Sequence, residues 1–290
     1  MYVTEPGPLV GGEWLAEHLA DADVRLVHVS PNRDAYDTGH IPGAVFSDLH
    51  VDMAKAGASA DTGTAHRMYL VPTRDEVASS LASWGVAPGN RLVFCDESQG
   101  RWAIRGYWLM RLYRFPKERL HVLDGGLPLW RSEGRAMTTE ATEPHTVKAT
   151  EPLGDRDDSL IATAEEVLDW SLESAAPGGP TRLLDVRRID EFLGLDVMAA
   201  RGGRIPGSRH RLFTDFVAPD GRLRPAAEAL AILRGSGVDP GELRAVYCQG
   251  GVRAALVWFE LHEVAGLDEV RNYAASWEEW GNRRDLPVES

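Results

Sequence analysis

The chain has 290 residues and a formal net charge of −13, an acidic balance that argues against a nucleic-acid or anionic-membrane surface. Its two cysteines, Cys95 and Cys248, are too few and too far apart for a disulfide framework or a structural zinc site. Residues 1–10 lack the features of a secretory signal, and no run approaches the roughly 18 apolar residues of a membrane span, so we expect a cytoplasmic protein.

The first half alternates short apolar runs with helical patterns. A strand is expected at 25–29, followed by the sequence Gly-His-Ile-Pro-Gly-Ala at 39–44. A helix is expected over 73–84, because Thr73 and Glu76 have the spacing of a capping box. A second strand, 92–95, ends just before Asp96.

The second half repeats these features in the same order. Gly-Arg-Ile-Pro-Gly-Ser at 203–208 returns at an offset of 203 − 39 = 164, and Thr163-Ala-Glu-Glu forms another capping box. The strand-like run 245–247 ends at Cys248, which takes the place of Asp96. An arginine follows five residues later in each half, Arg101 and Arg253, and both halves close on a strand-like run that leads to a tryptophan.

This repetition predicts two tandem domains. Strands alternating with helices favour an α/β fold in which each domain has a mainly parallel sheet with helices on both faces. A polar spacer with Pro144, Pro152 and Gly154 lies between the halves. We therefore expect domains at 1–140 and 158–290, joined by a linker at 141–157.

The strongest functional signal is the loop Cys248-Gln249-Gly250-Gly251-Val252-Arg253, which lies between the strand 245–247 and a helical pattern at 254–261. The glycines allow successive N–H groups to point inward, and the helix start and Arg253 add positive charge. Positive surroundings favour the nucleophilic thiolate. Two alternatives stay open: that Cys248 is a buried core residue, and that Arg253 binds a nearby carboxylate.

These motifs resemble the tandem-domain rhodanese family of sulfurtransferases, which act on thiosulfate or 3-mercaptopyruvate. The resemblance runs from about residue 13 to 280 and includes 36–44, 122–130, the Cys248 loop and 276–280. It implies an inactive first domain, with Asp96 at the cysteine position, and a catalytic second domain. It also implies that Cys248 takes a sulfane sulfur as a persulfide and passes it to cyanide or a thiol. No metal or organic cofactor is expected, because the thiolate itself carries the group.

The sequence departs from the family's pattern around the loop. Gln249-Gly250 matches neither the basic residue typical of thiosulfate enzymes nor the Gly-Ser of mercaptopyruvate enzymes. The family's donor-binding arginine corresponds to Glu191, for which Arg188 or Arg201 could substitute, and Arg204 replaces a histidine. The donor, the acceptor and the oligomeric state are therefore left open.

Four further residues are candidates for binding the donor in a cleft between the domains: Arg187, Arg201, His66 and Trp277. Arg187 could instead form a salt bridge with Asp185 or Asp190, and His66 could be an exposed loop histidine. The other tryptophans and Cys95 are expected to pack in the core.

Two rival functions remain. A cysteine phosphatase is disfavoured, because four residues separate Cys248 from Arg253 where phosphate-binding relatives have five. A sulfur-relay protein is the stronger rival: a partner enzyme would load Cys248, which would then supply a sulfur-carrier or biosynthetic protein.

Overall fold

The computed structural model describes residues 6–54 and 71–290, which divide into two compact units. One unit holds the described residues up to 54 together with Val71–Asp157 and Pro219–Leu223. The other holds Asp158–Ala218 and Arg224–Ser290. The expected linker, 141–157, contains no helix or strand. Its role as a linker, and the domain limits 1–140 and 158–290, stay predictions.

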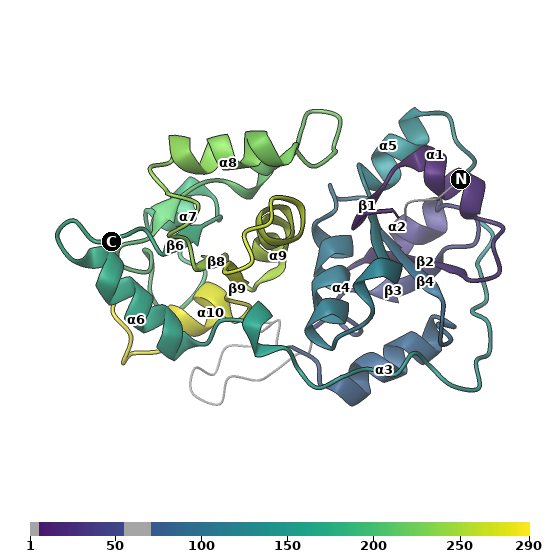
Figure 1. Cartoon of the computed structure of the whole chain (residues 1–290), viewed down its shortest axis with the longest axis horizontal. Coiled ribbons are helices and arrows are strands. Elements are labelled where there is room, and N and C mark those ends of the chain that lie inside the picture. The colour runs from purple at the N-terminus through teal and green to yellow at the C-terminus, as the bar shows by residue number, and fades with distance from the viewer. Residues whose placement is uncertain (1–5, 55–70) are drawn as a thin grey trace. The chain divides into compact units, whose positions relative to one another are not determined.

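The first unit is built on five parallel strands in the order β1-β5-β4-β2-β3 (Figure 1). The strands are β1 (Leu9–Val10), β2 (Val24–Ser30), β3 (Val45–Asp48), β4 (Arg91–Cys95) and β5 (Leu120–Leu123). The helices are α1 (Gly12–His18), α2 (Arg33–Thr38), α3 (Arg74–Ser83), α4 (Arg101–Leu112), the 3₁₀ helix η1 (Lys117–Arg119) and α5 (Gly126–Ser132).

Side chains of β4 alternate between two apolar layers, as a strand buried on both faces requires. Val93 and Cys95 pack in a cluster with Trp130 of α5. Phe94 points the other way, where its ring meets that of Trp84, at the end of α3, edge to face with centroids 5.7 Å apart. Fully burying such a side chain stabilises the fold by about 1.5–3 kcal/mol. The prediction of helices on both faces of a parallel sheet is confirmed.

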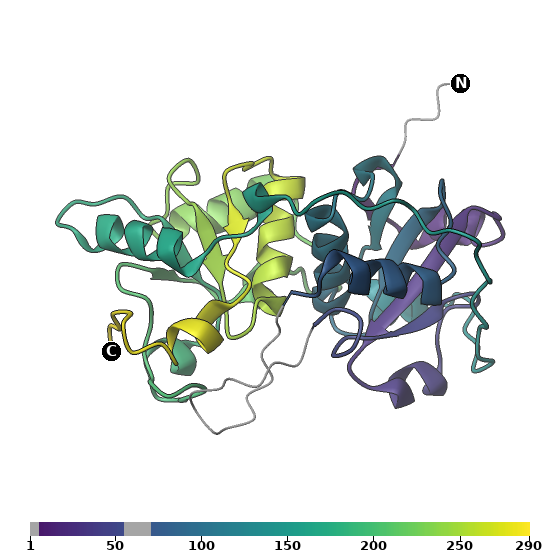
Figure 2. The same ribbon diagram turned by 90° about the horizontal axis from the view of Figure 1, so that it is seen from below.

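The second unit has four parallel strands in the order β7-β6-β8-β9. The strands are β6 (Leu183–Asp185), β7 (Arg209–His210), β8 (Ala245–Tyr247) and β9 (Arg271–Asn272). The helical segments are η2 (Asp158–Leu160), α6 (Ala164–Ala175), α7 (Ile189–Phe192), η3 (Phe213–Phe216), α8 (Ala226–Gly235), α9 (Val252–Trp258), the π-helix η4 (Phe259–Val264) and α10 (Ser276–Trp280). Figure 2 shows these strands between α6 on one side and α9 on the other.

The local sequence explains where the helices begin. Thr73 and Thr163 each accept a hydrogen bond from the backbone of the glutamate three residues later, and that glutamate bonds back, so both expected capping boxes are confirmed. The helix expected at 254–261 starts two residues earlier, because Gly251 takes the N-cap position, and it ends in the π-helix η4. No helix among the described residues is long and apolar enough to cross a membrane.

Candidate active site

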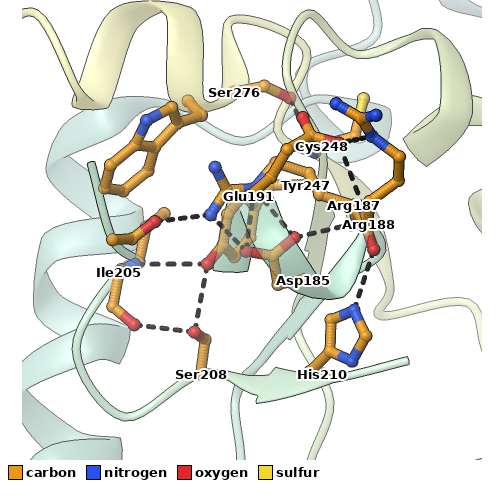
Figure 3. Close-up of polar contacts among 12 residues, drawn as sticks. Asp185, Arg187, Arg188, Glu191, Ile205, Ser208, His210, Tyr247, Cys248 and Ser276 are labelled. Carbon is orange, nitrogen blue, oxygen red and sulfur yellow. Dashed lines mark hydrogen bonds and ion pairs between the residues drawn. The ribbon is translucent and has the colours of Figure 1, made fainter. Parts of the chain in front are cut away.

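Cys248 is the first residue after the central strand β8, and its side chain is 1% exposed. The start of α10 holds its backbone in place. The Cys248 N–H donates to the Ser276 hydroxyl at 3.1 Å, and the Cys248 carbonyl accepts from the Trp277 N–H at 3.0 Å (Figure 3). Ser276 itself has φ +54°, an uncommon conformation outside glycine that places its hydroxyl for this role. Sequence reasoning missed Ser276, although it lies in the C-terminal signature.

The loop curls around the sulfur at Gly251. This residue has φ +77°, and a Cβ there would lie 2.4 Å from the carbonyl oxygen of Ala274, so only glycine fits. In this conformation the Gly251 N–H donates to Cys248 Sγ at 3.2 Å. The backbone therefore points at least one hydrogen-bond donor at the thiol.

The corresponding loop of the first unit shows what such a backbone can bind. Asp96 follows β4 as Cys248 follows β8, and its carboxylate is fully buried. It accepts four backbone N–H bonds, from Ser98 at 2.8 Å, Gly100 at 2.9 Å, Trp102 at 2.8 Å and Ala103 at 2.9 Å. The loop at this point in the fold is therefore an anion-binding nest.

The two loops differ in length by one residue. Gly100 and Gly251 are the left-handed N-caps of α4 and α9, but three residues separate Asp96 from its cap and two separate Cys248 from its own. When the loops are aligned at these two glycines, the Gly251 N–H corresponds to the Gly100 N–H, and each donates to the side chain that follows the strand. The two helical N–H groups that bind Asp96 then correspond to those of Arg253 and Ala254. A helix leaves these first N–H groups without an intrahelical acceptor, so they suit an anion held next to Cys248.

Arg253 forms a two-pronged ion pair with Glu191, with N–O distances of 2.8 and 2.9 Å. Glu191 is 2% exposed and also accepts from the backbone N–H and Nε of Arg188. Burial opposes ionisation of Glu191, but the Arg253 and Arg188 contacts outweigh it and lower the pKa to about 2. The interpretation that Arg253 binds a carboxylate is confirmed.

Arg187 is 1% exposed and lies within the domain core. Its guanidinium binds Asp185 through Nε and a terminal nitrogen, the closest distance being 2.7 Å, and it also donates to the Gly203 carbonyl at 2.7 Å (Figure 3). It stacks on Trp277, 4.5 Å from the ring centroid. The alternative interpretation, a structural salt bridge with Asp185, is the one that the structure supports.

The remaining candidates also have structural contacts. Trp277 is 1% exposed, and its indole N–H donates to the Arg201 carbonyl at 3.2 Å. Arg201 donates to four backbone carbonyls near the C-terminus, those of Trp280, Gly281, Arg283 and Leu286. Arg204 pairs with Glu289. His66 lies outside the described residues.

Gln249 ties the loop to its surroundings. Its side-chain amide nitrogen donates to the Met198 carbonyl at 3.0 Å and to the Glu278 carboxylate at 2.8 Å. Its carbonyl accepts from the Glu278 N–H at 2.8 Å. Gln249 therefore fixes its end of the loop through Met198 and Glu278, and the Glu278 carboxylate lies against the loop.

A buried tyrosine hydroxyl contacts the repeated Gly-x-Ile-Pro-Gly motif in each unit. In the second unit the Tyr247 hydroxyl accepts from the Ile205 N–H at 3.2 Å and lies 3.0 Å from the Ser208 hydroxyl (Figure 3). In the first unit the Tyr36 hydroxyl donates to the Ala44 carbonyl at 2.8 Å. In each unit the hydrogen bond from or to this tyrosine thus fixes the turn that the motif forms.

Comparison with known proteins gives two matches to the rhodanese-like domain, at residues 12–133 and 164–283. The sulfur carrier protein TtuD of Thermus thermophilus is 30% identical, with 99% of this chain and 98% of that protein covered. A thiosulfate sulfurtransferase of Corynebacterium glutamicum is 33% identical, with 98% and 91% covered. The crystal structure of the 3-mercaptopyruvate sulfurtransferase SseA from Escherichia coli is similar in fold, with a TM-score of 0.74, 24% identity, and 94% and 99% covered.

Proposed function

Because the chain belongs to the rhodanese family of sulfurtransferases, we propose that Cys248 is its sulfur-carrying nucleophile. The chain is an enzyme that moves a sulfane sulfur from a small donor to a thiophilic acceptor. The proposal assigns the persulfide to Cys248, its cradle to Gln249–Arg253, and the role of donor to thiosulfate or 3-mercaptopyruvate.

The reaction has two half-steps. The Cys248 thiolate attacks the outer sulfur of thiosulfate, a new S–S bond forms, and sulfite leaves with the electron pair of the old one. Cyanide or a thiolate then attacks the outer sulfur of the persulfide, and the electron pair of its S–S bond returns to Cys248 as thiolate. In each half-step a negative charge lies on or beside the Cys248 sulfur.

The backbone around Cys248 suits this charge. The Gly251 N–H already contacts the sulfur, and the N–H groups of Arg253 and Ala254 at the start of α9 are placed for the outer sulfur. Ser276 and Trp277 fix the loop, so these donors need no rearrangement as the charge moves. In this proposal three of the candidate donor-binding residues hold the surrounding backbone in position instead of touching the donor: Arg187, Arg201 and Trp277. Donor binding by His66 stays a prediction.

One observation carries the proposal: the first unit binds its own carboxylate, Asp96, with four N–H groups at the place where the second unit carries a thiol. The test is the intact mass of the protein after brief exposure to thiosulfate or 3-mercaptopyruvate. We expect a gain of one sulfur, about 32 Da, that cyanide reverses. No gain with either donor would contradict the proposal.

A second candidate is a sulfur-relay role, which the full-length similarity to the sulfur carrier protein TtuD favours. A partner enzyme would then load Cys248, which would deliver sulfur to a carrier or biosynthetic protein. Fast loading from a partner's persulfide, with slow turnover of both small donors, would support it. A cytoplasmic location, and a function without nucleic acid or membrane, stay predictions.

A further inference from the structure

Three arginines of the second unit, Arg187, Arg188 and Arg253, are already engaged with carboxylates. Arg253 pairs with Glu191, and Arg187 pairs with Asp185. Arg188 contacts Glu191 and also Asp196. The loop is therefore flanked by compensated cations.

Glu191 is the group on which two of these cations converge. Its Oε2 lies 2.8 Å from Arg253 and 3.1 Å from the Nε of Arg188, and its Oε1 lies 2.9 Å from Arg253. Glu191 is almost completely buried, so solvent screens its charge only weakly. Burial lowers the pKa of Arg253, but the hydrogen bonds to Glu191 and then the nearby charge of Cys248 outweigh burial and raise it. Glu191 thus opposes the field that Arg253 exerts at the sulfur.

A second carboxylate, that of Glu278, contacts the Cys248 loop through Gln249 and has the same sign of charge as Glu191. The Gln249 amide contacts the Glu278 carboxylate at 2.8 Å, and Glu278 is 7% exposed. Two poorly solvated carboxylates, Glu191 and Glu278, therefore lie against the loop that carries the nucleophile. A donor with two negative charges therefore finds less positive charge here than free arginines would offer, whereas a donor of lower charge depends less on such cations.

We propose that Glu191 selects the sulfur donor: by pairing with Arg253 and Arg188 it withholds their charge from the Cys248 cradle and favours donors of low negative charge over the thiosulfate dianion. This inference rests on the proposed role of Cys248 and names the donor class. Among donors of sulfane sulfur, a persulfide R–S–SH with an uncharged R group is then expected to react better than thiosulfate, which becomes the poorer of the donors proposed above.

The reaction with such a donor is balanced without a further reagent. The Cys248 thiolate attacks the outer sulfur of R–S–SH and forms a new S–S bond. The old S–S bond breaks, R–S⁻ leaves with its electron pair, and the proton stays on the transferred sulfur. The leaving thiolate carries one negative charge, whereas sulfite carries two.

The test compares Glu191→Gln with the wild-type protein on two donors, thiosulfate and the persulfide of 2-mercaptoethanol. Glutamine keeps the size and the hydrogen-bonding oxygen of Glu191 but releases the charge of Arg253. We expect kcat/KM for thiosulfate to rise about tenfold, mainly through KM, and kcat/KM for the uncharged-R persulfide to stay within about twofold. The thiosulfate rate of the variant is also expected to fall more steeply with salt.

Two further variants separate charge from structure. Glu191→Asp keeps the charge, so its ratio of thiosulfate to persulfide activity is expected to equal that of the wild-type protein, even if both rates fall. Glu166→Gln is a charge-matched control, because Glu166 pairs with Arg271, which lies opposite Ala245 at the other end of β8 from Cys248. It is expected to leave both donors unchanged.

Equal changes on both donors in Glu191→Gln would show that Glu191 is only structural and would overturn the inference. A thiosulfate KM that does not change would overturn it as well. Failure of the proposed function looks different: the wild-type protein would then form no persulfide with any donor, and Cys248→Ser would behave like the wild type.

Discussion

The loops after β4 and β8 lie at the same place in the two units, but one surrounds a carboxyl group and the other a thiol. In the first unit a buried carboxylate, Asp96, accepts four backbone N–H bonds and fills the nest permanently. Among the described residues of the second unit, the Gly251 N–H is the one backbone donor that contacts the Cys248 sulfur. The first loop is therefore filled by its own carboxyl group, whereas the second surrounds the thiol of Cys248.

The largest expected effect follows from replacing the nucleophile. Cys248→Ser should lower sulfur transfer by a factor of about 10³ or more, because a hydroxyl is not ionised at neutral pH and forms no persulfide. The change is nearly isosteric, so the unfolding transition should stay close to that of the wild-type protein. Transfer rates and circular dichroism together check this.

The matched control is Cys95→Ala in the other loop. Burial, followed by the charges of Asp96 and Glu97, raises the pKa of Cys95, so this thiol stays protonated and unreactive. The variant should keep full transfer activity. Loss of activity in Cys95→Ala, or activity retained in Cys248→Ser, would break the comparison.

Removing the built-in anion should destabilise the first unit alone. Asp96→Ala leaves four N–H groups without their acceptor, two of them buried and two partly buried, and we expect a loss of about 3 kcal/mol in the free energy of unfolding of that unit. Denaturant unfolding checks this through the transition that moves to lower denaturant. Asp37→Ala is the control, since Asp37 forms an exposed pair with Arg33 that should contribute less than about 0.5 kcal/mol. Similar values for both variants would contradict the account.

The Glu191 ion pair predicts a pH dependence for the second unit. The folded-state pKa is about 2, below the ordinary value of 4.5, so the pair stabilises the fold above pH 4.5 and loses this effect as the pH falls toward 2. Glu191→Gln should therefore lower the free energy of unfolding by about 2 kcal/mol at pH 7, since the cost of burying the charges offsets part of the ion pair's contribution, and by much less near pH 3. Unfolding curves at both pH values measure the difference.

A comparable ion pair in the first unit, at a different place in the fold, gives a second measurement of the same kind. Glu151 binds Arg119 at 2.8 Å, and these contacts lower the pKa of Glu151. Glu151→Gln should show the same sign of pH dependence, in the other unfolding transition. A Glu191→Gln effect that does not change between pH 7 and 3 would show that packing, rather than charge, stabilises the pair.

The smallest effects should be equal in the two units. Thr73→Ala and Thr163→Ala each remove the side-chain acceptor of a capping box, and each should lower stability by about 1 kcal/mol. Thermal unfolding of the two variants measures this. Serine at either position keeps the hydroxyl and serves as the control. An effect in only one unit would mean that the two helices do not begin in equivalent ways.

The sequence predicts the fold well because its signals are local and occur twice. The capping boxes, the Gly-x-Ile-Pro-Gly motifs and the strand before Cys248 each depend on a few neighbouring residues. The glycine at 251 was also predictable, because a tight turn beside a strand needs a residue that tolerates positive φ.

The partners of the arginines could not be predicted in the same way. Arg201 and Arg253 have long side chains with several donors each, and their acceptors come from distant parts of the chain. The pair of Arg187 with Asp185, only two residues away, was by contrast among the alternatives that the sequence offered. The one-residue difference in length between the two loops could not be seen in the sequence either. Arg101 and Arg253 both stand five residues after Asp96 and Cys248, yet the first is the first residue of α4 and the second is the second residue of α9.

The most direct test of the two-loop account is to locate the transferred sulfur. The protein would be treated briefly with a donor, alkylated and digested, and the peptides that contain Cys95 and Cys248 compared by mass. The account predicts one extra sulfur, about 32 Da, on the Cys248 peptide and none on the Cys95 peptide. Sulfur on the Cys95 peptide, or on neither peptide after every donor, would contradict it.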